Sequence, residues 1–241
     1  MTSLVQYSLT DGVATITLDD GKRNALSAEM VRQLHDALDR AEADRALVIL
    51  TGREEIFSAG FDLKTLRGKP GPALKMLHGG FSLPARLLRY PYPVIAACNG
   101  HCYAMGVFLM LSADYVIGSR GDFRVCANEV AIGLTMPRVA VAVLRHRLTP
   151  AAFQTAVTLA REFPAEQALE AGFFDELAEA PALHQRADEV ARESVRLDMP
   201  AHKGSKLRIR RSLLRRLRVA IWLDLLNATL LGLRAALGRK Q

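Results

Sequence analysis

The chain has 241 residues, of which 50% are apolar and 24% charged, a composition typical of one large globular domain and not of a disordered or fibrous protein. Its formal net charge of +7 is local, because eleven Lys and Arg but a single acid, Asp224, follow residue 202. Residues 1–202 carry 21 basic and 24 acidic side chains. The body of the chain is therefore slightly acidic, and we expect no nucleic-acid partner.

The sequence carries no targeting or metal-binding signal. Its first residues do not join a basic stretch to an apolar core, so no signal peptide is expected. No window reaches the roughly 18 apolar residues of a membrane helix, and the most apolar stretch, 219–233, contains Asp224. Cys98, Cys102 and Cys126 are an odd set without a CxxC spacing, which predicts neither a disulfide framework nor a zinc site. We expect a cytoplasmic protein that needs no metal or redox cofactor.

From the N-terminus, the pattern predicts two strands, over 7–9 and 13–18, around a turn at 10–12. Ser27 is a candidate N-cap for a helix whose apolar residues recur at helical spacing. These apolar residues are Val31, Leu34, Leu38 and Ala41. A short, fully apolar strand is predicted next, over 47–50.

The alternation of helix and apolar strand then recurs. The sequence predicts a helix over 73–89, a strand over 94–98, a helix over 104–112 and a strand over 115–117. Short apolar strands separated by helices are typical of a largely parallel sheet that is covered on both faces. The fold class expected from the sequence is therefore α/β.

After Pro137 the pattern becomes helical to the end of the chain. The predicted helices begin at Thr149–Pro150, cover 165–171 and 183–197, and end with a basic helix over 206–230. Met199–Pro200 is expected to break the chain before that last helix. We divide the chain into an α/β core over 1–200 and a basic amphipathic helical segment over 201–241.

Two glycine-containing segments, 57–63 and 99–106, each follow an apolar strand and precede a helix, and we expect both to be loops. Such a loop can point free backbone N–H groups outward, and the N-terminus of the helix behind it adds positive potential. N–H groups of both loops that converge on one carbonyl oxygen would form an oxyanion hole. Small residues at strand–helix turns are also common packing devices, and the residues alone leave this alternative open.

Four segments together resemble the signatures of the crotonase (enoyl-CoA hydratase/isomerase) superfamily. They are GKRNALS at 21–27, FSAGFDLK at 57–64, NGHCYAMGVFLMLSADYVI at 99–117 and NEVAIGLTMP at 128–137. They stand in the family's order and with family-like separations. The resemblance implies an α/β fold with a spiral ββα core and a helical C-terminal region.

The resemblance also implies which residues meet an acyl-CoA thioester. The backbone N–H groups of Phe61 and Met105 would form the oxyanion hole around the thioester carbonyl, and Glu129 would be the catalytic acid/base. Lys22 and Arg23 would reach the phosphates of coenzyme A. The remaining substrate-binding residues would be Ala25, Ala59, Asp62, Leu63, Ala104, Phe108 and Asn128.

The surroundings of Glu129 agree with a role as the base. Its neighbours in the sequence are largely apolar, and a carboxylate in a dry setting has its pKa raised toward neutrality. Removal of a proton next to a thioester carbonyl requires such a base within hydrogen-bond reach. A glutamate that caps a neighbouring helix would show the same local pattern, so the residues alone leave both interpretations open.

One departure from the family pattern bears on the reaction. Hydratases of this family use two glutamates, and Phe108 stands where the first of them is expected. A double-bond shift from position 3 to position 2 needs one base, so the single Glu129 favours a Δ3,Δ2-enoyl-CoA isomerase. The alternatives are an enoyl-CoA hydratase with an atypical site and a catalytically silent protein that binds acyl-CoA.

The basic segment has an amphipathic pattern. One side of the helical wheel carries Leu207, Leu214, Leu217, Ile221 and Leu225, and the adjacent side carries Arg208, Arg211, Arg215 and Arg218. We expect the apolar side to pack within or between subunits. The resemblance implies two uses for such a segment, oligomerisation into a homotrimer or a dimer of trimers and a cover over the active site. Contact with an anionic membrane surface and contact with coenzyme A phosphates are the alternatives.

Overall fold

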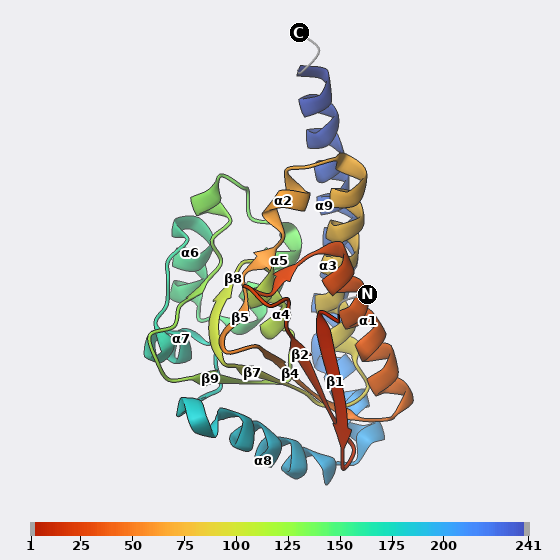
Figure 1. Cartoon of the computed structure of the whole chain (residues 1–241), viewed down its shortest axis with the longest axis vertical. Helices are drawn as coiled ribbons and strands as arrows, with labels where there is room; N and C mark the ends of the chain where they lie inside the picture. The colour runs from red at the N-terminus through yellow and green to blue at the C-terminus, as the bar shows by residue number, and fades with distance from the viewer. Residues whose placement is uncertain (1–2, 239–241) are drawn as a thin grey trace.

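The computed structural model describes residues 3–238, and it is built around a six-stranded sheet (Figure 1). The strands follow the order β1-β2-β4-β7-β9-β11. β1 and β2 pair antiparallel, and every other neighbouring pair in this sheet is parallel. Their bounds are β1 Val5–Thr10, β2 Val13–Leu18, β4 Leu47–Gly52, β7 Val94–Cys98, β9 Tyr115–Ser119 and β11 Glu176–Ala178.

Helices cover both faces of this sheet, which is why β4 and β7 are buried along their whole length. On one face, Ile49, Ile95 and Ile117 pack against α8 (Leu183–Val195). On the other, the larger core joins the sheet to the helices α1 Ala28–Ala43, α3 Pro70–Arg89 and α4 Met105–Met110. Ser27 caps α1 as predicted, since its side chain accepts the N–H of Met30.

The sequence predicts that the two glycine-containing segments are loops, and this prediction is wrong in part. They contain the short strands β5 Glu55–Ser58, β6 Gly60–Phe61 and β8 Gly100–Tyr103. β5 and β8 pair with each other and β8 pairs with β10 (Val125–Cys126), while β6 pairs with β3 (Ala25–Leu26). These strands exist through pairings between distant segments, which leave no local pattern in two to four residues.

The C-terminal part begins with the 3-10 helix η1 and is mostly helical. Its elements are η1 Val130–Ile132, α5 Arg138–Arg147, α6 Pro150–Leu159, α7 Ala165–Ala171, η2 Ala180–Ala182, α8 and α9 Met199–Gly238. The prediction of helix alone after Pro137 is wrong at β11, which adds an edge strand parallel to β9. Glu176 of β11 accepts from the Tyr115 hydroxyl and the Arg186 guanidinium, contacts that no local pattern announces.

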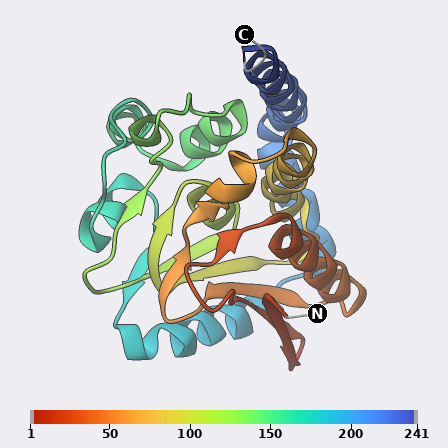
Figure 2. The ribbon, with the colours of Figure 1, turned by 45° about the horizontal axis from the view of Figure 1, so that its top comes forward.

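The last helix, α9, begins at Met199, so the predicted break at Met199–Pro200 is wrong. Proline is tolerated in the first turn of a helix, where its missing N–H has no partner to lose. Asp198 caps this turn by accepting the N–H of Ala201 at 2.7 Å. The helix runs beside α3 and α5, and its C-terminal end extends beyond the body of the molecule (Figures 1 and 2). Arg239, Lys240 and Gln241 lie outside the described residues.

The predicted apolar side of α9 packs within the chain itself. Leu217 is buried, and Leu214, Ile221 and Leu225 pack half-buried against the main core. The four arginines predicted to flank this side are exposed. In the described part of the chain, none of the helices combines the length and the apolarity needed to cross a membrane.

Two basic residues of α9 are buried, which the sequence did not indicate. Lys206 Nζ lies 2.5 Å from Asp114 Oδ2, and Arg210 Nη1 lies 2.8 Å from Asp114 Oδ1. Asp114 Oδ2 also accepts the N–H of Val94 at 2.8 Å, at the start of β7. This three-residue cluster, Asp114–Lys206–Arg210, ties α9 to the sheet.

Candidate active site

A cavity of about 820 Å³ opens where α3, the β6–α2 segment, η1 and α9 meet. α2 is the short helix Leu63–Leu66 that follows β6. Most of the wall is apolar, with a few polar groups among the lining residues, as in sites that enclose a small organic ligand. The wall includes Ala59, Phe61, Leu63, Arg67, Ala73, Leu77, Phe81, Ala104, Phe108, Asn128, Glu129, Ile132, Met136, Arg138, Asp224, Asn227 and Ala228.

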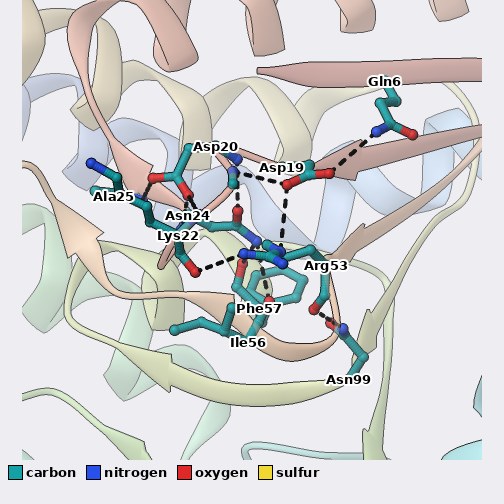
Figure 3. A network of polar contacts seen from close by, with 11 residues as sticks. Gln6, Asp19, Asp20, Lys22, Asn24, Ala25, Arg53, Ile56, Phe57 and Asn99 are labelled. Carbon is teal, nitrogen blue, oxygen red and sulfur yellow. Dashed lines mark hydrogen bonds and ion pairs between the residues drawn. The ribbon is translucent and has the colours of Figure 1, made fainter. Parts of the chain in front are cut away.

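A polar network places the 19–25 turn beside the first glycine segment (Figure 3). The Asp20 carboxylate accepts the N–H groups of Lys22, Asn24 and Ala25 at 2.7, 2.8 and 2.9 Å. Asn24 is buried at φ 51°, and its Nδ2 donates to the carbonyl of Ile56 at 3.1 Å. The turn therefore presents β3 to β6, which brings Ala25 opposite Gly60.

The two glycine segments meet at Gly60. This residue has φ 84°, and a Cβ built on it would lie 2.7 Å from the Ala104 Cβ and 3.2 Å from the Met105 nitrogen. Ser58 fixes the approach, because its hydroxyl accepts the Gly60 N–H at 3.2 Å and donates to the Asn24 carbonyl at 2.8 Å. Only glycine permits this contact, so the flank of β6 lies directly against the start of α4.

The backbone at Ala104 is strained, at φ 49° and ψ −124°. Non-glycine residues in such a conformation cost of order 1–3 kcal/mol and cluster at functional sites. Ala104 precedes Met105, the first residue of α4, and N–H groups in the first turn of a helix have no acceptor inside the helix. The N–H of Met105 is therefore a donor without an acceptor inside α4, while the Met105 side chain is buried in the core.

Glu129 is a buried ionisable group in the wall of the cavity. It precedes η1, is 6% exposed, and its Oε2 has no hydrogen-bond partner among the residues that the structure describes. Asn128 Oδ1 beside it is buried and unpartnered in the same described set. Burial raises the pKa of Glu129 to about 7. A buried carboxyl group with one such oxygen can take up and release a proton near neutral pH.

A family model described as enoyl-CoA hydratase/isomerase matches residues 8–218. The chain belongs to the enoyl-CoA hydratase/isomerase family. Two relatives illustrate the match, one of them through two solved structures. Carnitinyl-CoA dehydratase from Salmonella typhi is 30% identical over 186 residues, which are 76% of this chain and 71% of that protein. A solved structure of an enoyl-CoA isomerase from Mycobacterium tuberculosis is 44% identical, with a TM-score of 0.88 over 92% of this chain and 97% of that one. A second structure of that same Mycobacterium tuberculosis protein, named there a probable enoyl-CoA hydratase, is 43% identical, with a TM-score of 0.91 over 98% and 99%.

Membership of the enoyl-CoA hydratase/isomerase family confirms the superfamily and the fold class inferred from the four sequence segments. The chain therefore belongs to a family of enzymes that act on acyl-CoA thioesters. The related proteins carry the names isomerase, hydratase and dehydratase, so the family leaves the individual reaction to be argued from the site.

Seven of the residues predicted for the site line the cavity together. They are Ala59, Phe61, Leu63, Ala104, Phe108, Asn128 and Glu129. Phe108 is 1% exposed on α4, and the described α4 carries no carboxylate. Of the carboxylates predicted for the site, Glu129 lies in the described wall of the cavity and Asp62 does not.

The other predicted residues lie around the cavity and not in its described wall. Lys22 and Arg23 are exposed on the turn of the Figure 3 network, and Ala25 lies on β3. Asp62 caps α2, because its carboxylate accepts the N–H groups of Lys64 and Thr65 at 3.2 and 3.1 Å. A hydrogen bond from the Thr65 hydroxyl lowers the Asp62 pKa.

The sequence offered a cover over the active site as one role of the C-terminal segment, but it did not predict which residues of α9 line this cavity. Asp224, Asn227 and Ala228 line it, and Asp224 is 8% exposed. Asp224 Oδ2 accepts the N–H of Val139 at 2.9 Å, and Oδ1 lies 3.2 Å from Arg138 Nη1. A signal was present, since Asp224 is the single acid after residue 202 and falls on the same side of the helical wheel as Leu217.

Proposed function

We propose that this chain is a Δ3,Δ2-enoyl-CoA isomerase in which Glu129 is the single base. The observation that carries the proposal is the buried carboxyl group of Glu129, whose Oε2 has no partner in the described residues, in a cavity where Phe108 stands at the position that the family resemblance gives to the other glutamate. Hydration needs one group to activate water and a second to protonate carbon. A double-bond shift needs one group that moves a proton between two carbons.

The proposed reaction uses the two backbone donors and the one base. The N–H groups of Phe61 and Met105 hold the thioester oxygen, where negative charge develops as a C2 proton leaves for Glu129. The electron pair of that C–H bond forms the enolate. Collapse of the enolate shifts the double bond to C2–C3, and C4 takes the proton back from Glu129. A base with a pKa of about 7 suits both transfers near neutral pH.

The proposal assigns the rest of the substrate to the surrounding residues. Ala25, Ala59 and Leu63 contact the pantetheine, while Lys22 and Arg23 meet phosphate groups of coenzyme A. The reaction requires no metal or redox cofactor, because coenzyme A is part of the substrate. The three cysteines are free and buried, in keeping with the cytoplasm that we propose as the compartment. We also propose a homotrimer or a dimer of trimers as the assembly.

Addition or removal of water is the second candidate reaction. Asn128 Oδ1 and Glu129 Oε2 are both buried acceptors without a partner in the described residues, and both residues line the cavity. A water molecule or a 3-hydroxyl group carries the O–H donors that such acceptors require. The relative named carnitinyl-CoA dehydratase adds support for this alternative.

The deciding experiment follows 3-enoyl-CoA and 2-enoyl-CoA spectrophotometrically with the wild type, Glu129→Gln and the matched control Glu170→Gln, an exposed glutamate on α7. We expect the wild type and the control to isomerise 3-enoyl-CoA and barely hydrate 2-enoyl-CoA. Glu129→Gln should lose isomerisation by 10²–10⁴-fold, roughly the range typical of general acid–base catalysis. Efficient hydration that depends on Glu129 would replace the isomerase by the hydratase. Binding of both thioesters without turnover would identify a catalytically silent acyl-CoA-binding protein.

A further inference from the structure

The helix α3 forms one wall of the cavity, and it contains two adjacent glycines, Gly79 and Gly80. Glycine inside a helix costs about 1 kcal/mol relative to alanine, so its presence calls for a packing reason. At Gly79 the reason is α1, since a Cβ would lie 2.7 Å from Val31 Cγ1. At Gly80 the reason lies toward the site: a Cβ would lie 2.2 Å from Cε1 and 2.4 Å from Cζ of Phe61.

The ring of Phe61 therefore sits in the space that Gly80 leaves on α3. It also meets the Phe81 ring edge-on, with centroids 5.5 Å apart and an interplanar angle of 79°. We call this contact of Phe61 with Gly80 and Phe81 the aromatic seat. An edge-to-face aromatic pair is worth about 0.5–1.5 kcal/mol beyond its buried area, so the seat holds the ring in one place.

Apart from the aromatic seat, Phe61 is held through the backbone on either side of it. β6 has two residues, and it joins β3 through the pairs Ala25–Gly60 and Leu26–Phe61. Asp62, the next residue, already turns into α2 as its N-cap. The pairing with β3 and the cap of α2 fix the backbone before and after Phe61. The ring between these two points rests on α3.

We propose that Gly80 is a positioning residue that orients the backbone N–H of Phe61 toward the thioester oxygen. The inference rests on the proposed function, in which that N–H is one of the two oxyanion donors. A Cβ at position 80 would force the end of the ring away by about 1.2 Å, since ordinary contact begins at 3.4 Å and the ring carbon lies at 2.2 Å. The proposal requires part of this shift to reach the Phe61 backbone N–H, where a misplacement of about 1 Å can cost roughly 10²-fold in rate.

The test is a double-mutant cycle of Gly80→Ala and Phe61→Leu, with Gly204→Ala as the matched control. Gly204 is an exposed helical glycine of α9, and apart from its chain neighbours and its own helix nothing in the described part of the chain comes within 4 Å of a Cβ built there. Leucine lacks the ring atoms that meet position 80 but keeps the backbone N–H. The readouts are kcat and KM for 3-enoyl-CoA, and the absorption of bound 2,4-dienoyl-CoA, which moves to longer wavelength when its carbonyl is polarised by hydrogen bonds.

We expect Gly80→Ala to lower kcat about 100-fold, with KM changed less than about threefold, and to lose most of the wavelength shift. In the Phe61→Leu background the same change should cost less than about fivefold. Gly204→Ala should behave as the wild type. Equal losses in both backgrounds, or a wavelength shift that Gly80→Ala retains, would overturn the aromatic seat as a positioning device.

Two further outcomes are informative. Gly80→Ala that fails to fold while the double variant folds supports the seat, because removal of the ring removes the clash; failure of both variants overturns it. A wild type that binds 2,4-dienoyl-CoA without any wavelength shift overturns the oxyanion site itself. That result rejects the proposed function and is distinct from every outcome that rejects only the role of Gly80.

Discussion

Two carboxylates of the molecule have opposite surroundings. Asp114, just before β9, receives the Val94 N–H, the Lys206 ammonium and the Arg210 guanidinium within 2.5–2.8 Å. Glu129, at the cavity, has an Oε2 without a partner in the described residues. In a poorly solvated interior, a charge is stable when it is paired and hydrogen-bonded, and otherwise its pKa shifts. Asp114 therefore stabilises the fold, while Glu129 is the group that we propose to exchange a proton.

The largest expected effect is on the paired carboxylate. Asp114→Ala leaves Lys206 and Arg210 buried without their counter-charge, so it should lower the free energy of unfolding by about 3–5 kcal/mol. Lys206→Met keeps the Arg210–Asp114 pair and removes an ammonium whose burial lowers its pKa to about 8. It should change stability by less than about 1 kcal/mol, or raise it. Urea unfolding of both variants measures the difference, and equal losses would contradict it.

The unpaired carboxylate should show the reverse sign. Its pKa of about 7 in the folded chain lies above the ordinary 4.5, so ionisation of Glu129 destabilises the fold as pH rises through that window. Glu129→Gln removes the ionisation and should raise the free energy of unfolding at pH 8 by up to about 3 kcal/mol. The gain should vanish below pH 4.5, where the folded and unfolded carboxyl groups are both protonated. A variant less stable than the wild type at pH 8 would show that the carboxylate has partners.

The same pKa sets the pH dependence of the reaction. If Glu129 must be ionised to remove the C2 proton, kcat/KM for 3-enoyl-CoA should rise with pH and level off above about 7. At pH 6 the rate should be about tenfold below the plateau, because only about a tenth of the base is ionised there. Initial rates between pH 5 and 9 test this. A midpoint near pH 4.5, the ordinary pKa of a glutamate, would mean that the Glu129 carboxylate is better hydrated or accepts more hydrogen bonds than its surroundings in the structure indicate.

Seven of the residues predicted for the site line one cavity, whereas the residues that α9 adds to that cavity were not predicted. The two glycine-containing segments and Glu129 stand out in the sequence because they combine particular residues at short spacings. The Ser27 cap and the apolar strands β4 and β7 were equally local. β11 was missed because its partner β9 lies far away in the chain, and the burial of Lys206 because its partner, Asp114, is equally remote.

Asp224 is the intermediate case, since it lines the cavity as Glu129 does and is paired as Asp114 is. If pairing decides the role, Asp224 holds α9 against the first turn of α5 and takes no part in proton transfer. Asp224→Ala leaves the Val139 N–H without its acceptor and should cost about 1–2 kcal/mol of stability, as the loss of a helix cap does. Asp188→Ala, at an exposed position on α8, is the matched control and should cost less than about 0.5 kcal/mol. Thermal unfolding and isomerisation by the same preparations separate the two roles. A variant that keeps its stability but loses turnover would identify Asp224 as a second acid. Pairing of a carboxylate would then not exclude it from proton transfer.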